Sequence, residues 1–232
     1  MCQNEGGEKK MKFKVKIKSE EPIVLPIHYN HILKGFIFSN FFTESSPFTF
    51  SNLFGPKKVS LSNKKIIFND HCHFYFSTIE SSHLKLEELL NKLLNLGRNR
   101  VKVEEITPVE EEVNGQPVVV KTLSPITVFR RESGGKTFYF SPDREEFYRL
   151  LEENLNEKVK KFLGKEAGGV KIKPSQSSVF KKAVVQYRNR FIVEAWKGMF
   201  EIEGEREAIE AALKLGLGYK NSQGFGMVAI SG

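Results

Sequence analysis

The sequence predicts an α+β protein built from two consecutive units, each with the order β-α-β-β-α-β. Segments in which apolar and polar residues alternate, as in half-buried strands, lie between segments whose apolar residues recur every three or four positions, as in amphipathic helices. The same order occurs twice along the 232 residues, and an Asn114-Gly115 turn signal separates the two occurrences. A chain of this length can bury one large core or two cores of about 100 residues each.

The first unit begins with its clearest strand. In 12–18 the apolar Phe13, Val15 and Ile17 alternate with lysines, so we expect one buried face and one polar face. A helix is expected from about residue 30, where apolar residues follow a helical stripe. The other expected elements are extended segments at 48–54 and 57–62, strands at 64–68 and 73–78 joined by a turn at Asn69-Asp70, a leucine-rich amphipathic helix at 84–96 closed by Gly97, and a strand at 101–106.

The second unit repeats this order. Its most regular element is a helix after Ser141-Pro142, with acids near its start and lysines near its end, as the helix dipole favours. The other expected elements are strands at 117–123 and 126–131, strands near 170–173, 182–189 and 191–202, and a short helix at 205–215. Both units match the ferredoxin-like, or RRM-like, order. We therefore expect a flexible leader at 1–10, an N-terminal ferredoxin-like domain at 11–112 and a C-terminal ferredoxin-like domain at 113–232.

The composition indicates a folded, basic protein. Apolar residues make up 40% of the chain, too many for a disordered protein, and the formal net charge is +8. This charge favours an anionic partner, most commonly nucleic acid, or else a basic surface without a specific partner. No apolar run approaches the roughly 18 residues of a membrane span, and the first ten residues lack the apolar stretch of a signal peptide. With only Cys2 and Cys72, we expect a reduced, cytoplasmic setting and no membrane contact.

The most informative segment is LGLGYKNSQGFGMVAI, residues 215–230. Its glycines, spaced G-x-G-x5-G-x-G, are Gly216, Gly218, Gly224 and Gly226. Glycines at this spacing allow positive φ and close approach of the backbone to a ligand, and their amides can cradle phosphates. Lys220, Asn221 and Ser222 add a cation and hydrogen-bonding groups. The segment is neither a Walker loop nor a dinucleotide fingerprint, because no Gly-Lys-Ser/Thr and no βαβ unit follow. The alternative is a glycine-rich hairpin shaped by packing alone.

Four segments together resemble one known family. GLGYKNSQGFGMV at the C-terminus resembles the glycine-rich signature of the CRISPR-associated precursor-RNA endoribonucleases of the RAMP (repeat-associated mysterious protein) superfamily. LPIHYNHILKGFIF (25–38) is similar to the family's first helix, PFTFSNL (47–53) to its Phe-Thr-Phe-Ser segment, and TLSPITV (122–128) to the start of its second domain. The resemblance extends over 11–232 and implies two ferredoxin-like domains.

The resemblance also implies an activity and a partner. The partner is CRISPR repeat RNA, as precursor and as processed guide. The implied reaction is metal-independent cleavage within the repeat, in which the RNA 2′-hydroxyl attacks the adjacent phosphate and leaves 2′,3′-cyclic phosphate and 5′-hydroxyl ends. Such a reaction needs a base, an acid and stabilisation of charge on phosphate, and no cofactor.

The catalytic residues depart from the family pattern. Many members keep a histidine just after the first helix and often a tyrosine on it, but 39–51 contains no histidine and Phe38 lies about where the tyrosine would be. The available substitutes lie at the start of the helix: His28, Tyr29, His31 and Lys34. The alternative is that His28 and Tyr29 merely end a loop. A repeat-RNA binder that cuts very slowly or not at all, and a structural subunit of an RNA-guided effector complex with other CRISPR proteins, both stay open, as does a homodimer.

The candidate RNA contacts are basic. Residues 171–190 contain six cations, no acid, and the interleaved aromatic Phe180 and Tyr187, a composition that suits phosphate contacts with base stacking. The six are Lys171, Lys173, Lys181, Lys182, Arg188 and Arg190. Arg130 and Arg131, which end a strand before Gly134-Gly135, are further candidates, although any one of these cations alone is as well explained by a solvated surface.

A metal site is not expected. His71, Cys72 and His73 place three ligand types in a row, but alternate residues of a strand face opposite sides. No second cluster of cysteine and histidine completes a tetrahedral site.

Overall fold

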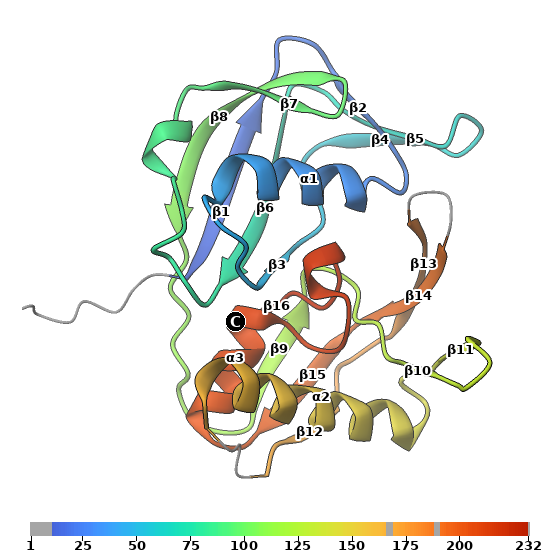
Figure 1. The fold of residues 1–232 in the computed structure, drawn as a ribbon. Helices are drawn as coiled ribbons and strands as arrows, with labels where there is room; N and C mark the ends of the chain where they lie inside the picture. The colour runs from blue at the N-terminus through green and yellow to red at the C-terminus, as the bar shows by residue number, and fades with distance from the viewer. Residues whose placement is uncertain (1–10, 166–168, 188–190, 232) are drawn as a thin grey trace, which may run out of the picture.

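The computed structural model describes residues 11–165, 169–187 and 191–231 and has an α+β fold with two halves stacked one above the other (Figure 1). The predicted leader, Arg188 and Arg190 lie outside the described residues. The N-terminal half contains β1 (Lys12–Lys18), β2 (Ile23–Pro26), α1 (Asn30–Phe41), β3 (Phe48–Phe50), β4 (Lys57–Ser60), β5 (Lys65–Phe68), β6 (His71–Thr78), the 3-10 turn η1 (Glu87–Leu89), β7 (Leu93–Leu96) and β8 (Asn99–Pro108). The C-terminal half contains β9 (Val118–Thr122), β10 (Phe129–Arg131), β11 (Thr137–Tyr139), α2 (Glu145–Leu163), β12 (Lys171–Pro174), β13 (Lys181–Tyr187), β14 (Phe191–Lys197), β15 (Met199–Glu203), α3 (Arg206–Leu215), η2 (Asn221–Gln223) and β16 (Val228–Ile230).

The main sheet of the N-terminal half is antiparallel, with the order β3-β6-β1-β8-β7. Helix α1 packs Leu33, Phe36 and Ile37 onto the face that carries the buried alternate residues of β1 and β6. A second, smaller sheet has the order β2-β5-β4. Since β5 and β6 belong to different sheets, the predicted turn at Asn69-Asp70 joins strands that do not pair with each other.

The helix predicted at 84–96 is wrong. This segment forms only the single turn η1 and then the edge strand β7, which pairs with β8. Asn91 between them adopts a left-handed φ of 62°, which breaks a helix and which asparagine tolerates better than most residues. Leu94 and Leu96, two apart, are buried as in a strand, while Leu93 is exposed. The spacing of the leucines fits both the helical repeat of three or four residues and the strand repeat of two, and pairing with β8 selects the strand.

The C-terminal half follows its predicted order closely. Its sheet has the order β12-β15-β9-β16, and α2 and α3 pack together on one face (Figure 1). Helix α2 is ended by Gly164, whose φ of 64° is the left-handed conformation in which glycine commonly closes a helix. The strand expected at 191–202 is interrupted at Gly198, between β14 and β15. The Phe180 ring packs closely on this glycine, since a Cβ there would lie 2.3 Å from the ring. Two hairpins, β10–β11 and β13–β14, stand apart from the main sheet.

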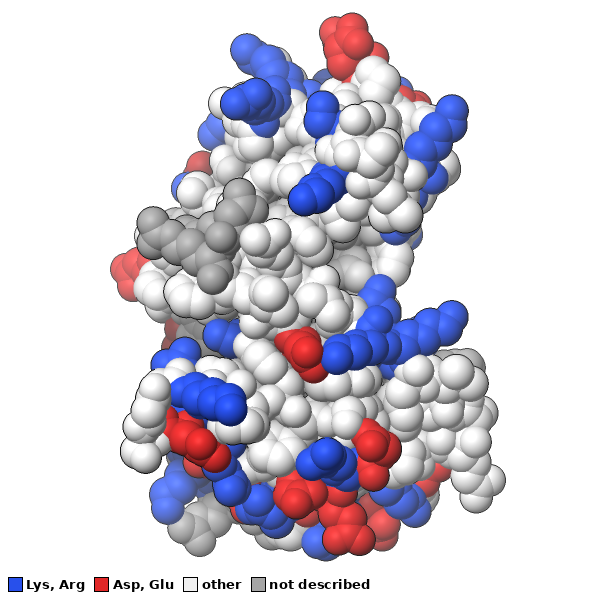
Figure 2. Space-filling model, turned by 90° about the vertical axis from the view of Figure 1, so that its right-hand side faces the viewer, with Lys and Arg blue, Asp and Glu red and all other residues white. Residues whose placement is uncertain are grey.

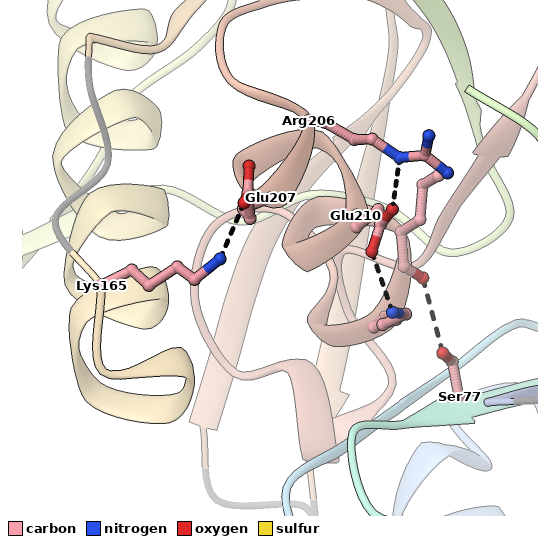
Figure 3. Close-up of polar contacts among 7 residues, drawn as sticks. Ser77, Lys165, Arg206, Glu207 and Glu210 are labelled. Atoms are coloured by element: carbon pink, nitrogen blue, oxygen red, sulfur yellow. Dashed lines mark hydrogen bonds and ion pairs between the residues drawn. The ribbon is translucent and has the colours of Figure 1, made fainter. Parts of the chain in front are cut away.

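Each half has its own main core, and polar contacts join the halves. The N-terminal core holds Tyr29 and nine packed phenylalanines: Phe13, Phe36, Phe41, Phe42, Phe48, Phe50, Phe68, Phe74 and Phe76. Between the halves, the hydroxyl of Ser77 on β6 donates to the carbonyl of Leu213 on α3 (3.5 Å; Figure 3). The same close-up shows Lys165, beyond the end of α2, paired with Glu207 of α3 at 2.7 Å. None of the helices in the described part of the chain is long and apolar enough to cross a membrane.

Candidate functional site

The glycine-rich segment 215–230 lies where the two halves meet. Its four glycines are buried and have positive φ between 66° and 87°. A Cβ at Gly226 would lie 1.9 Å from the Leu217 carbonyl oxygen, and one at Gly224 would lie 2.7 Å from Nδ2 of Asn30. Gly216 N–H donates to the Ala212 carbonyl and Gly226 N–H donates to the Pro125 carbonyl. Packing therefore accounts for these glycines, and at least two of the amides that might cradle a phosphate are already bonded.

Contacts from this segment reach the start of α1. Nδ2 of Asn30 donates to the carbonyls of Gln223 (3.3 Å) and Gly224 (3.2 Å). The hydroxyl of Thr49 on β3 donates to the Phe225 carbonyl (3.4 Å). The start of α1, which carries His31 and is preceded by His28, is thus fixed directly to the segment that resembles the family signature.

A lysine that the sequence did not single out holds the segment from the other side. Nζ of Lys158, on α2, donates to the carbonyls of Gly216 (2.7 Å) and Gly218 (2.8 Å). Its ammonium group is enclosed and has no carboxylate partner in the described part of the chain, and burial lowers its pKa from 10.5 to about 7. Lys158 lies next to the apolar stripe of α2, and its spacing gives no signal of this role.

The polar residues of the segment divide between packing and exposure. Nδ2 of Asn221 donates to the carbonyls of Leu217 (3.1 Å) and Phe225 (3.2 Å), so Asn221 shapes the loop. Lys220 is half-buried, with Nζ 5.1 Å from the centre of the Phe129 ring, and Arg131 lies 6.0 Å from the same ring. Burial first, and then the charge of Arg131, lowers the pKa of Lys220. The fold thus brings Lys220 and Arg131 together on one aromatic ring, with Ser222 half-buried nearby in sequence.

The two candidate histidines have different neighbours. The His31 ring lies edge-on to Tyr187 of β13, 6.1 Å between ring centres, and its Nδ1 is buried with no hydrogen-bond partner in the described structure. His28 lies just before α1, beside the turn that precedes β5, where burial and then the charge of Lys64 lower its pKa. His28 is therefore held toward its neutral form, while His31 faces the C-terminal half.

Tyr29 lies in the core. Its hydroxyl oxygen accepts a hydrogen bond from the Leu53 N–H (2.8 Å), and burial raises its pKa above its usual range. Lys34, one turn beyond His31, is half-buried on α1. Phe38 is 43% exposed.

The run of cations at 171–190 is free of acids in sequence but not in space. Strand pairing and packing bring a carboxylate to three of its lysines: Lys171 to Glu152 (3.5 Å), Lys173 to Glu201 (3.2 Å) and Lys182 to Glu194 (2.8 Å). Lys181 pairs in register with another lysine, Lys197. This run is therefore less positive than its sequence implies.

Two cations that the sequence analysis missed face each other across the boundary between the two halves, which we call the junction. Lys57 of β4 and Lys197 of β14 come from different halves, and neither has an ion pair within the described residues. Burial, followed by the charge of Lys57, lowers the pKa of Lys197. Figure 2 shows lysine and arginine side chains gathered where the upper and lower halves meet. Only the fold could identify this pair, since 140 positions separate its members.

The histidines of β6 do not join Cys72. Cys72 is buried in the N-terminal core, whereas His71 and His73 lie on the opposite, half-exposed face of the strand, and His71 pairs with Asp70 (2.6 Å). The described residues contain no group of three metal-ligating side chains.

Comparison with known proteins identifies the family. The family model for CRISPR associated protein Cas6, C-terminal, matches residues 107–230, more than half of the chain. The CRISPR-associated endoribonuclease Cas6 1 of Methanocaldococcus jannaschii is 24% identical over 247 residues, 94% of this chain and 92% of that protein. The CRISPR-associated endoribonuclease Cas6 of Pyrococcus furiosus is 31% identical over 172 residues, 68% of this chain and 60% of that protein. The solved structure of a Cas6-related protein from Pyrococcus furiosus matches with a TM-score of 0.81 at 20% identity, covering 95% of this chain and 98% of that one. The chain belongs to the Cas6 family of CRISPR-associated endoribonucleases.

Proposed function

We propose that this protein binds CRISPR repeat RNA and cleaves the precursor transcript within the repeat without a metal ion. The 2′-oxygen bonds to the adjacent phosphorus as the bond to the 5′-oxygen breaks, which gives a 2′,3′-cyclic phosphate and a 5′-hydroxyl. The observation that carries this proposal is the junction, where His31 of α1, the glycine-rich segment and lysines without ion pairs from both halves lie at one boundary.

The α1 residues divide the chemical roles. His28, held toward its neutral form, accepts the proton of the 2′-hydroxyl, and His31 donates a proton to the leaving 5′-oxygen. Lys34 stabilises the charge that develops on the phosphate. Tyr29, with its hydroxyl bonded in the core, holds the start of the helix in place rather than moving a proton.

The RNA contacts come from both halves. Lys220, Ser222 and Arg131 offer one group, and Lys57 with Lys197 offers another at the junction. The four glycines shape the first group by packing. Phosphate contacts of this kind make binding fall steeply with added salt.

The proposal includes two ferredoxin-like domains, 11–112 and 113–232. In support, the strand order β8-β1-β6-β3 of one half corresponds to β16-β9-β15-β12 of the other. In each set, the strands are the fourth, first, third and second of those four in chain order. The N-terminal unit departs from the complete pattern because η1 and β7 replace its second helix.

Cleavage in EDTA tests the activity. The purified protein is incubated with its own repeat RNA, and cyclic-phosphate products are expected. His28→Ala and His31→Ala should each slow cleavage at least tenfold while RNA binding changes little. His83→Ala is the matched control, because His83 is paired with Glu80 and Glu44 near the other end of α1. Full activity of the His28→Ala/His31→Ala double variant would overturn the assignment.

A protein that binds the repeat without cutting it is the second candidate. It is favoured by the bonded hydroxyl of Tyr29 and by Phe38, an exposed ring without a hydroxyl. Tight binding with intact RNA after long incubation would support it. Poor binding to free repeat, with stable co-purification of other CRISPR proteins, would instead support a subunit of an effector complex.

A further inference from the structure

The two hairpins of the C-terminal half and the start of α2 enclose a pocket of about 570 Å³. The lining residues used below are Arg130 of β10, Phe138 and Tyr139 of β11, Arg144 before α2, and Lys182 and Trp196 of β13 and β14. None of its lining residues belongs to α1 or to the glycine-rich segment. The volume lies in the range of sites for small organic ligands.

The cations of the pocket are only partly neutralised. Lys182 is paired with Glu194 at 2.8 Å. Arg130 and Arg144 make no ion pair with any described residue. Apart from Glu194, the only carboxylate among the lining residues is that of Glu132. The planar fork of a guanidinium matches the oxygens of a phosphate and can donate two hydrogen bonds to it. The pocket therefore has a net preference for an anion.

Aromatic rings supply the other surface. Trp196 and Phe138 come from different hairpins, and the hydroxyl of Tyr139 donates to the Ile192 carbonyl (2.9 Å), which ties the two hairpins together. Phe138 is 37% exposed, with Nζ of Lys136 4.7 Å from the centre of its ring, whereas Trp196 is only 6% exposed and packs in the C-terminal core. Phe138 therefore offers the accessible aromatic surface, and Trp196 contributes a small part of the lining. Nζ of Lys182 lies 6.0 Å from the centre of the Trp196 ring. Aromatic surface beside free guanidinium groups is the combination that binds single nucleotides of RNA by stacking and phosphate contact.

We propose that this pocket binds one unstacked nucleotide of single-stranded RNA, with the base on Phe138 beside the small exposed part of Trp196 and the phosphate on Arg130 and Arg144. The inference rests on the proposed function, because it takes the nucleotide to be part of the repeat RNA. A free mononucleotide has the same chemistry, so the test includes it as a separate arm. The pocket adds a recognition site that shares no residue with the proposed catalytic group on α1.

Trp196 is the only tryptophan of the chain, so intrinsic fluorescence reports on this pocket directly. The intact protein is titrated with repeat RNA, with each of the four ribonucleoside 5′-monophosphates, and with inorganic phosphate. We expect a saturable change in tryptophan emission with the RNA and a weaker one with at least one mononucleotide. Arg144→Gln should weaken RNA binding about tenfold. Arg149→Gln is the control. It removes the same charge from the first turns of α2, at a residue that is paired with Glu153, and should leave binding within twofold.

The outcomes separate the alternatives. No emission change with RNA, or equal effects of Arg144→Gln and Arg149→Gln, overturns the proposal. A response to mononucleotides but not to RNA overturns it in favour of a free nucleotide, and an equal response to inorganic phosphate overturns the stacking of a base. Cleavage is measured in the same samples. Cleavage of the RNA without any fluorescence change would overturn the pocket proposal and leave the proposed function supported. RNA that is bound with the expected change but not cut supports the pocket and contradicts the nuclease.

Discussion

Four strands of the main sheet follow the same order in the two halves of the molecule, but the two sheets are covered differently. In the C-terminal half, α2 and α3 both come from the half itself and pack on one face of the sheet. Among its described residues the N-terminal half has a single α-helix, α1, and its strands β3 and β6 are contacted by α3 of the other half. Ser77, whose hydroxyl bonds to Leu213 of α3, is completely buried there. The N-terminal sheet thus depends on its neighbour for part of its cover.

This difference places the junction at the centre of the stability of the molecule and of its proposed function. The glycine-rich segment follows α3 directly and packs on Asn30 and Phe50 of the N-terminal half. A change in this segment therefore disturbs three things together: the cover of the N-terminal sheet, the last part of the C-terminal half, and the position of the histidines at the start of α1. Substitutions at the junction should have larger effects than equivalent substitutions within either half.

The largest expected effect is at Gly226. Its φ of 75° is unfavourable for any side chain, and a Cβ would overlap the Leu217 carbonyl oxygen at 1.9 Å. Gly226→Ala should lower the free energy of unfolding by about 2–4 kcal/mol, measured by urea denaturation. Gly134→Ala, in the β10–β11 turn with no atom near its added Cβ, is the control and should change stability by less than about 0.5 kcal/mol. Equal stabilities of the two variants would show that the segment does not depend on close packing.

The next effect is a dependence of stability on pH that comes from Lys158. Its pKa is about 7 in the folded protein and 10.5 ordinarily, so between these values the unfolded chain binds more protons. Stability should therefore rise with pH across this window, by up to roughly 1.4 kcal/mol per pH unit, and the cost of burying the charge is fully present below pH 7. Unfolding measured from pH 7 to 9 should show this slope in the wild type and in the exposed-site control Lys161→Met. Lys158→Met should lose it, and an unchanged slope in that variant would contradict the assignment.

The contrast between the halves also explains which features the sequence could predict. Strand β1 and helices α1, α2 and α3 were predicted because each has one buried face, and burial of one face imposes a period on the sequence. The prediction for residues 84–96 was wrong because the clustered leucines fit both the helix and the strand repeat, and only pairing with β8 selects the strand. Without a helix there, the N-terminal half needs α3, a dependence that no local pattern records.

The candidate site was predictable where it is contiguous in sequence. The glycine-rich segment was found from the spacing of its glycines, and the histidines at the start of α1 were named as substitutes for the residues that the family resemblance implies. The opposition of Lys57 and Lys197, the hold of Lys158 on two carbonyls, and the acids beside Lys171, Lys173 and Lys182 depend on contacts between distant segments. For the same reason, the glycines that spacing alone related to phosphate binding proved to be required for packing between segments.

The smallest expected effect is a shift in the pKa of His28, which lies within the N-terminal half and away from α3. Burial lowers its pKa most, and the charge of Lys64 adds to this. Lys64→Gln should therefore raise the pKa of His28 by part of its displacement and leave it below the ordinary value, which a titration of the His28 ring followed by NMR would measure. Lys58→Gln, which removes an exposed charge from β4, is the control and should leave the titration unchanged. If His28 is the base, the acidic limb of the cleavage profile should move to higher pH in Lys64→Gln by the same amount as the NMR titration. An NMR shift without a matching kinetic shift would assign the base to another group, and His31 would be the next to test.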